Sequence, residues 1–391
     1  MSIKDNFPAV RPQLLIDIAN TEVLDPRVVS SRASVATYYD KFGVLQTASA
    51  NEPRIGYNPV TGAVEGLIRE AQGTNLVTYS EDFSNGAWVK EVSATVTTNT
   101  LVAPDGTLTM DALNITSSGA IYQAVTVGSL VPHTFSQYLK KGSLSSVILQ
   151  GYDTNYWART TFNLETGTIT SVQDGTATIE YVGNGVYKCS VTGTPNSLST
   201  LIFTVPQTAG NCYLWGAQLE AGSFPTSYIK TEASQVTRSA DSASMTGTNF
   251  SDWYRQDEGS FYAEATQLTP SASYFPVLTG LGRTINEFIN INLGPSYSLY
   301  VYNFSSQAIL NADDTTQGVV SKIVGVYRTN DFAVCVDSGV IVTAMSGIVP
   351  FLTSLSIGRD QGATTLYSGY IKKIAYYPTR LSNENLQALT S

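Results

Sequence analysis

The sequence predicts an all-β protein, made of tandem antiparallel β-sandwiches of the jelly-roll type with a short C-terminal helix. Three observations support this prediction. Only 14% of the 391 residues are Asp, Glu, Lys or Arg, well below the ~25% that is usual for soluble globular proteins. The chain is instead rich in Thr, Ser, Gly and Asn and contains 23 Tyr, and these residues populate strands and turns. Short alternating or apolar runs recur between turn signals along the chain, as in sandwiches and barrels.

The charge balance excludes further classes of protein. The net charge is −9 and no cluster or stripe of Lys and Arg is present, so we expect no nucleic-acid partner. No stretch approaches the ~18 uncharged apolar residues of a membrane-spanning helix. The sequence also starts without the basic region and apolar core of a secretory signal. We therefore expect no membrane insertion.

The cysteine and histidine contents limit the possible chemistry. Cys189, Cys212 and Cys335 lack metal-ligand spacing, so we expect small buried core residues, with a Cys189–Cys212 disulfide as a minor alternative. His133 is the one histidine of the sequence. A multi-histidine metal site is thus impossible, and we expect His133 to lie in a turn or on the surface.

Residues 1–73 form the first of three predicted segments. The apolar run Leu14–Asn20 predicts a buried strand. Residues 36–46 predict a hairpin with Asp40–Gly43 at its tip. Residues 58–62 carry Asn-Pro and Thr-Gly, which are turn signals.

Residues 74–235 predict the first sandwich, because short strands alternate with turn signals throughout. The clearest hairpin signal is Asn184-Gly185 ahead of a strand at 186–191, since this dipeptide suits a two-residue turn with positive φ angles. The other predicted strands cover residues 122–127, 134–139, 147–151, 159–164, 201–205 and 213–219.

Residues 236–391 predict a second sandwich followed by a helix. The predicted strands cover residues 260–265, 287–293, 298–302, 322–328, 332–336, 340–343, 355–358 and 369–377. The last ten residues predict the helix, because Ser382 can cap its N-terminus while Leu381, Leu386 and Leu389 can share one side.

Several strings of the sequence resemble virion proteins of tailed bacteriophages. Those that resemble the opening of these proteins are Arg11–Asn20, Leu24–Arg27, Ser31–Asp40, Gly66–Leu76, Tyr79–Phe83 and Trp88. Residues 69–76 read Arg-Glu-Ala-Gln-Gly-Thr-Asn-Leu, where the group usually has Glu-Glu-Ala-Arg-Thr-Asn-Leu. The middle segment resembles a carbohydrate-binding-module-like sandwich that closes on Leu214–Gly222 and Pro225–Ile229. The last segment resembles the concanavalin A-like or laminin-G-like fold, through Gly369–Tyr377 and Arg380–Ser382.

This resemblance implies a structural component of a phage particle, assembled in the host cytoplasm and exposed on the virion. We expect a tail fibre or receptor-binding subunit that adheres to bacterial surface glycans, with a head decoration or head fibre as the alternative. Because phage fibres are usually trimeric, the resemblance also implies a homotrimer. Residues 1–73 are expected to dock to other virion proteins. The alternative is that this segment lends strands to one of the sandwiches.

Two stretches are candidate carbohydrate-binding sites, because sugars stack on aromatic rings and need a few polar anchors. The candidate residues are Tyr152, Asp153, Asn155, Tyr156, Trp157, Arg159, Trp253 and Tyr254. The first six lie in one loop-like stretch, for which the alternative is that Trp157 packs at a sandwich edge and the polar residues solvate a turn. The alternative for the Trp253-Tyr254 pair is an inter-domain contact.

The remaining aromatic features are expected to be structural. Trp88 and Trp215 are expected in the core. Tyr300 and Tyr302 occupy alternate positions of one predicted strand, so they share a face of the sheet. We expect them to take part in a cross-strand aromatic ladder rather than in a binding site.

Catalysis and metal binding are not expected. Glucanases of the concanavalin-like fold carry a Glu-x-Asp-x-Glu string, which is absent here. Glu264 stands alone on its predicted strand, and the adjacent Asp313 and Asp314 would point to opposite faces. A glycan depolymerase stays an alternative. No cofactor is expected, although Asn311–Thr315 and Asn330-Asp331 are possible calcium ligands, because calcium prefers oxygen-rich loops.

Overall fold

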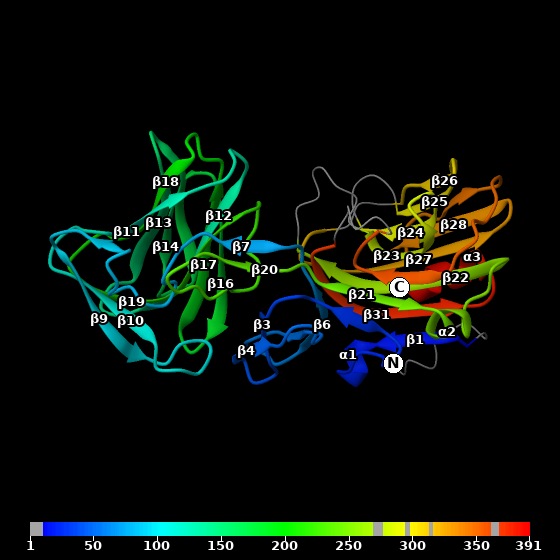
Figure 1. The fold of residues 1–391 in the computed structure, drawn as a ribbon, viewed down its shortest axis with the longest axis horizontal. Helices are drawn as coiled ribbons and strands as arrows, with labels where there is room; N and C mark the ends of the chain where they lie inside the picture. Colours follow the sequence, from blue (N-terminus) through cyan, green and yellow to red (C-terminus); the bar gives the residue numbers. More distant parts are fainter. Residues whose placement is uncertain (1–10, 269–276, 294–297, 313–315, 361–366) are drawn as a thin grey trace.

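The computed structural model describes residues 11–268, 277–293, 298–312, 316–360 and 367–391. The protein is almost entirely β-structure, arranged as two β-sandwiches that follow one another along its longest axis (Figure 1). This confirms the predicted fold class, including the short helix at the C-terminus. Among the described residues, no helix is long and apolar enough to cross a membrane.

The first sandwich consists of two six-stranded antiparallel sheets. One of them, here named the platform sheet, contains in spatial order β15 (Thr168–Asp174), β14 (Tyr156–Asn163), β13 (Ser146–Tyr152), β18 (Ser199–Pro206), β11 (Ile121–Thr126) and β8 (Val89–Lys90). The facing sheet contains β16 (Thr176–Gly183), β17 (Val186–Gly193), β12 (His133–Lys141), β19 (Gly210–Ala221), β10 (Met110–Ile115) and β9 (Ala94–Leu101).

The core of this sandwich follows from strand alternation, because every second side chain of a strand points inward. Leu149 and Ile202 of the platform sheet belong to the same buried cluster as Phe135 and Leu219 of the facing sheet. Trp88 and Trp215 are each 1% exposed, which confirms that both are core residues. Burying such side chains is the main favourable contribution to folding.

The second sandwich consists of an eight-stranded and a seven-stranded sheet. In spatial order, the larger sheet contains β29 (Val342–Ala344), β28 (Asp331–Val336), β27 (Val320–Arg328), β22 (Glu258–Gln267), β31 (Gly369–Tyr377), β6 (Val64–Arg69) and β5 (Ile55–Tyr57), with β1 (Leu14–Asp17) also paired to β31. The smaller sheet contains β2 (Val29–Ser31), β21 (Ser242–Thr246), β30 (Ser354–Ile357), β23 (Val277–Thr284), β24 (Glu287–Asn292), β25 (Leu299–Asn303) and β26 (Ser306–Leu310).

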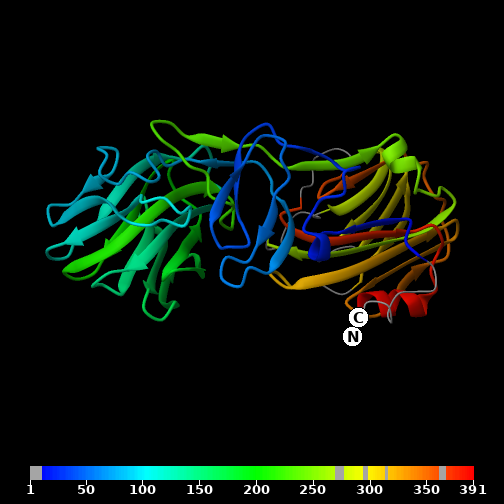
Figure 2. The same cartoon turned by 90° about the horizontal axis from the view of Figure 1, so that it is seen from below.

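The N-terminal segment forms part of this second sandwich. β1 runs antiparallel to β31, with Leu14 opposite Tyr376, and β6 pairs with the other end of the same strand. In Figure 2 the dark-blue N-terminal strands run beside the red C-terminal ones. The segment therefore lends strands to a sandwich, which was the alternative to a separate docking segment at residues 1–73.

The remaining elements are short. Two small sheets join β7 (Gly73–Asn75) with β20 (Val236–Arg238), and β3 (Ala36–Tyr39) with β4 (Leu45–Ala48). The helices are α1 (Ile18–Thr21), α2 (Thr248–Ser251) and α3 (Asn383–Thr390). The β7–β20 pair lies where the chain passes from one sandwich to the other (Figure 1).

Local sequence signals predicted several of these elements correctly. Asn184 and Gly185 have φ angles of 53° and 75°, as their hairpin turn requires. The β3–β4 hairpin turns at residues 40–43, where Asp40 Oδ1 accepts the backbone N–H groups of Phe42 and Val44. Ser382 caps α3 by accepting the N–H of Asn385.

The cysteines lie in the core, as predicted, whereas His133 does not lie where we expected it. Cys189 and Cys212 are fully buried and form no disulfide, and burial raises the pKa of the Cys212 thiol to about 12. His133 is 1% exposed at the start of β12 instead of in a turn or on the surface. Burial lowers the pKa of its ring, whose Nδ1 lies 2.7 Å from the Val131 carbonyl oxygen.

A buried ionic cluster joins the two sandwiches. This junction network contains Arg32, Arg54, Arg69, Glu70, Ser227, Arg238 and Asp241, each of its charged side chains being at most 8% exposed. Ser227 comes from the segment that closes the first sandwich, and the arginines before residue 70 come from the N-terminal segment. The network thus connects three parts of the chain that are distant in sequence.

Asp241 is the acceptor for the N-terminal side of the network. Its Oδ1 lies 3.0 Å from Arg32 Nη1, and its Oδ2 lies 2.5 Å from Arg54 Nη2. The backbone N–H of Glu70 also donates to Oδ2, at 3.0 Å, and Arg69 donates to the Asp241 carbonyl oxygen. These bonds compensate for the large cost of removing a carboxylate from water.

Glu70 is the second acceptor of the network, for Arg54, Arg238 and Ser227. Its Oε2 lies 2.8 Å from Arg54 Nη2 and 3.1 Å from Arg238 Nη1. Ser227 donates to it through both its backbone N–H and its hydroxyl, each at 2.7 Å. Burial alone would raise the pKa of the Glu70 carboxyl, but the charges of Arg238 and Arg54 and the Ser227 bonds outweigh burial and hold this pKa well below its usual range.

We predict that Glu70→Gln lowers the free energy of unfolding by about 3–5 kcal/mol at neutral pH, because it leaves the buried Arg238 without a counter-charge and Arg54 with Asp241 alone. Because the pKa of Glu70 is lower in the folded than in the unfolded chain, its ionised carboxylate stabilises the protein at pH values above the usual glutamate pKa. This contribution is lost as pH falls below about 4.5. Urea unfolding between pH 7 and pH 3 should therefore show a steeper acid loss in the wild type than in the variant.

The matched control is Glu165→Gln, which removes an exposed glutamate whose partner Lys141 is also partly exposed. It should cost less than about 1 kcal/mol, since exposed ion pairs contribute little. Equal losses in the two variants, or identical pH slopes for the wild type and Glu70→Gln, would contradict the role assigned to the junction network.

Candidate functional site

The outward face of the platform sheet carries a continuous row of mostly apolar and aromatic side chains. In the strand register Val89 is opposite Tyr122, and Tyr122 is opposite Phe203. Phe203 is in turn opposite Gln150, and Gln150 is opposite Arg159. One row therefore crosses five neighbouring strands.

A second row, two residues further along the strands, adds more rings. Leu201 is opposite Tyr152, and Tyr152 is opposite Tyr156. We name the combined surface the platform, and it consists of Tyr122, Gln150, Tyr152, Tyr156, Arg159, Leu201 and Phe203. It extends about 14 Å from β11 to β14, since neighbouring strands lie ~4.8 Å apart.

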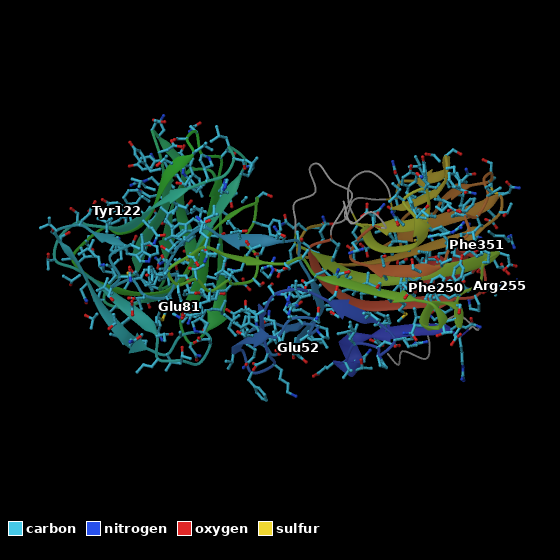
Figure 3. All side chains as sticks on the ribbon, in the orientation of Figure 1. Glu52, Glu81, Tyr122, Phe250, Arg255 and Phe351 are labelled. Atoms are coloured by element: carbon cyan, nitrogen blue, oxygen red, sulfur yellow. The ribbon has the colours of Figure 1, made fainter. Side chains whose placement is uncertain are left out.

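The platform rings are arranged in two contacting pairs. Tyr122 and Phe203 have centroids 4.8 Å apart with planes inclined by 35°. Tyr152 and Tyr156 meet edge to face at 5.2 Å. All four rings are at least partly exposed, Tyr156 by 36%. Figure 3 labels Tyr122, which marks this face on the first sandwich.

Arg159 is held in place by two platform neighbours. Its guanidinium carbon lies 4.6 Å from the centroid of the Tyr156 ring, a distance typical of a cation–π contact. Its Nη1 donates a 2.6 Å hydrogen bond to Gln150 Oε1. In the part of the chain that the structure describes, no carboxylate lies within ion-pair distance of this guanidinium.

Three of the eight predicted binding residues, Tyr152, Tyr156 and Arg159, meet on the platform. The stretch that contains them was predicted to be loop-like, but the structure shows otherwise: Tyr152 ends β13 and Tyr156 begins β14. Only residues 153–155 form the turn between these strands. The strand register is therefore what brings the three side chains together.

Asp153 and Asn155 lie in that turn. Asp153 accepts the backbone N–H groups of Thr154 and Asn155 on one oxygen, and those of Asn196 and Ser197 on the other. Partial burial would raise the pKa of Asp153, but these backbone donors hold it below its usual range. Asp153 thus fastens two neighbouring turns together, while Asn155 is exposed.

Trp157 lies in the core instead of on the binding surface. It is 4% exposed, and its indole N–H donates 2.7 Å to Thr200 Oγ1. Gly151 and Gly193 pack so closely against it that a Cβ at either glycine would lie within about 2 Å of a Trp157 atom. The strand periodicity explains the error, because neighbouring residues on a strand point to opposite faces.

Trp253 and Tyr254 follow α2 in the second sandwich and form an aromatic corner. Trp253 is 2% exposed and packs on Phe250 and Tyr376. Tyr254 stacks on Phe250 at 4.6 Å. Trp253 is thus a core residue of one sandwich, in contrast to both the binding role and the inter-domain contact considered for it.

Tyr122, Gln150 and Phe203 were missed by the sequence analysis, although their strands were predicted. A usable signal was present in β18, where the apolar Leu201, Phe203 and Val205 share one face of the strand, while Ile202 and Thr204 are buried on the other. Positions that face solvent are normally polar, so large apolar residues on both faces indicate a second functional or contact surface.

A second aromatic face in the other sandwich is the predicted ladder. Phe288 of β24 contacts Tyr300 at 5.2 Å and Tyr302 at 5.4 Å. Tyr300 and Tyr302 are 5.7 Å apart on β25. The cross-strand ladder is therefore confirmed, and these rings contact one another across the sheet.

A polar pocket of about 520 Å³ also opens on the first sandwich, and Glu81, labelled in Figure 3, lines it. Glu81 pairs with Lys230 at 2.7 Å. Asp111 accepts the backbone N–H groups of Phe83 and Asn99, and burial raises its pKa. These acidic side chains hold local structure, so the platform is the stronger candidate site.

The positions considered for catalysis and calcium have structural neighbours. Glu264 on β22 accepts a hydrogen bond of 3.3 Å from the Tyr262 hydroxyl. Asp331 pairs with Arg328 and Arg380. Asp313 and Asp314 lie outside the described residues. Among the described residues, no group of three His, Cys, Asp or Glu side chains is arranged to hold a metal.

Comparison with known proteins yields similarities of fold alone. No protein-family model and no curated protein sequence matches the chain. Among solved structures, the CBM40 of the Ruminococcus gnavus IT-sialidase bound to α2,3-sialyllactose is 13% identical, with 35% of this chain and 84% of that one covered and a TM-score of 0.31. Domain 4 of the Geobacillus stearothermophilus GH43 arabinanase AbnA, in complex with arabinotriose, is 8% identical, with coverages of 43% and 82% and a TM-score of 0.32.

A third similar structure, the Trypanosoma rangeli sialidase in complex with the inhibitor DANA, is 14% identical. The match covers 72% of this chain but only 60% of the sialidase, with a TM-score of 0.27. At these values, none of the three likenesses indicates what this chain binds, and the candidate site depends on its own geometry.

We predict that Trp157→Ala lowers the free energy of unfolding by about 3–5 kcal/mol, because it leaves a cavity between the sheets and removes the indole N–H that donates to Thr200 Oγ1. Tyr156→Ala, at the neighbouring exposed position, should change it by less than about 1 kcal/mol. Urea unfolding of the two variants checks this. Stability that is unchanged in Trp157→Ala would show that this residue is not a core residue.

Proposed function

We propose that this chain is a glycan-adhesion component of a bacteriophage particle, a tail fibre or receptor-binding subunit that binds bacterial surface sugars through the platform. The observation that carries the proposal is the row of partly exposed rings across the platform sheet, with Gln150 and Arg159 among them. The adhesive role needs no catalytic group.

The chemistry of the platform suits sugars. A pyranose ring offers a C–H face that packs on aromatic rings, and its hydroxyl groups need planar polar partners beside them. The ring pairs Tyr122–Phe203 and Tyr152–Tyr156 supply two stacking areas, with Gln150 between them in the register. Strands of a packed sheet hold these groups more rigidly than loops would, which lowers the entropy cost of binding.

The proposed virion location is supported by the strings that resemble phage proteins. Several of them lie in the N-terminal segment, within Ser31–Asp40 and Gly66–Leu76. The low fraction of charged residues also favours a protein that forms large protein–protein interfaces, because apolar and hydroxyl surfaces are easier to remove from water than charged ones. A homotrimer and docking to other virion proteins belong to the same proposal.

We predict that the double substitution Tyr122→Ala and Phe203→Ala weakens binding to host capsule or lipopolysaccharide glycans at least tenfold, because both stacking rings of one pair are lost. Retention of the wild-type and variant proteins on immobilised glycan measures the effect. Tyr181→Ala is the matched control, since Tyr181 is 43% exposed on the facing sheet. Its binding should equal that of the wild type.

The same incubation separates the rival functions. Retention without released oligosaccharide supports adhesion, whereas released oligosaccharide supports a glycan depolymerase. If the double variant is retained as well as the wild type, the platform is not the binding site. If the wild type is not retained on any host glycan, the adhesive function is wrong.

We predict that antibodies to this chain label the tail of intact virions in electron micrographs, because a receptor-binding subunit must reach the cell surface first. Labelling of the head would instead support the alternative, a head decoration or head fibre. Particles that carry no label at all would contradict a virion location.

A further inference from the structure

We infer that the platform selects acidic sugars, and that Arg159 binds the carboxylate of a uronic-acid unit. This inference rests on the proposed glycan-binding function and deepens it. It comes from the way in which one cation is held by Tyr156 and Gln150 without an ion pair to a described carboxylate.

The orientation of Arg159 is fixed before any ligand binds. The guanidinium lies over the Tyr156 ring at 4.6 Å and donates to Gln150 Oε1 at 2.6 Å. A guanidinium has five N–H donors in a rigid plane, and within the described residues Gln150 is the one acceptor that it contacts. The remaining donors form the fork that recognises a carboxylate through two parallel hydrogen bonds.

Among the described residues Arg159 has no carboxylate partner, in contrast to three arginines of the junction network. The buried arginines Arg32, Arg54 and Arg238 all pair with Asp241 or Glu70. Asp174 is opposite Arg159 in the strand register, but the register shifts at this point and the two side chains form no ion pair. An anionic ligand group can therefore occupy the position that a carboxylate of the protein takes at the other sites.

The position of Arg159 also fits a sugar rather than a free anion. A carboxylate bonded to this guanidinium lies beside the Tyr152–Tyr156 pair and next to Gln150. The ring that bears the carboxylate then has aromatic surface to pack on, while the buried Gln150 keeps the guanidinium in place. Because the net charge of the chain is −9, the general field repels anions, and selection must come from this local arrangement.

The test uses the full chain and two oligosaccharides that differ in one group. One contains glucuronic acid, and the other is the same oligosaccharide with each carboxyl group reduced to a primary alcohol. Titration calorimetry should show at least tenfold tighter binding of the acidic form by the wild type, since a charge-assisted bidentate contact is worth about that much. Arg159→Gln should bind both forms equally, with the affinity that the wild type has for the neutral form.

Two further variants sharpen the result. Arg159→Lys keeps the charge but loses the planar fork, so its preference for the acidic form should fall between those of the wild type and Arg159→Gln. Arg283→Gln is the matched control, because Arg283 also lies over a ring, that of Phe351, but in the second sandwich. It should retain the full preference.

The possible failures are distinguishable. If the wild type binds the neutral form as tightly as the acidic one, the inference is overturned and the proposed glycan binding stands. If it prefers the acidic form and Arg159→Gln keeps that preference, the carboxylate is recognised elsewhere and the inference is also overturned. If neither form binds, nor any host glycan, the proposed function fails and the inference fails with it.

Discussion

Asp241 and Glu70 hold four buried arginines between them, and the geometry of the molecule depends on this arrangement. Each carboxylate is the counter-charge for side chains from different parts of the chain, so none of these parts can move away without leaving a charge buried and unpaired. One consequence concerns the N-terminal segment. Removal of residues 1–73 takes away β1, β5 and β6 from the larger sheet of the second sandwich, and it also leaves Arg238 and Asp241 without their ion-pair partners. Failure of such a truncated chain to assemble would therefore report loss of folding, and docking must be examined with surface substitutions instead.

Three of the strings on which the expected phage resemblance is based contain residues of the junction network, while Arg54, Arg238 and Asp241 lie outside all of them. Arg69 and Glu70 lie in the Gly66–Leu76 string, Arg32 lies in Ser31–Asp40, and Ser227 lies in Pro225–Ile229. These three strings therefore contribute side chains to the joint between the two sandwiches. The platform residues lie outside all of them. The joint and the platform thus depend on separate parts of the sequence.

What the sequence predicted correctly was local. The Asn184-Gly185 turn, the Ser382 cap and the buried Trp88 and Trp215 each follow from a few neighbouring residues. What it predicted poorly was the pairing of distant strands. Tyr122 and Phe203 are 81 positions apart by number and meet only through the register of β11 with β18, which no short motif encodes. The Trp157 prediction failed for a related reason: assigning the whole stretch to a loop ignored the alternation that directs this side chain inward. Similarly, the partner strand of Leu14–Asp17 lies at the other end of the chain.

The low charge content takes on a more specific meaning once the charges are located. Many of the arginines are neutralised by carboxylates, either in the junction network or in ion pairs elsewhere in the protein. The electric field of these arginines is therefore short-ranged. The two platform rows contain only Arg159 and, at the edge, Asp174 as charged residues. Within the ~8–10 Å over which salt screens charges, Asp174 on the neighbouring strand is thus the one charged residue of these rows beside the guanidinium. A surface with many scattered lysines and glutamates would bind anions weakly at several places. Sparse charge, in contrast, lets one oriented arginine dominate the local field of the platform, which is the condition that the proposed selection of acidic sugars requires.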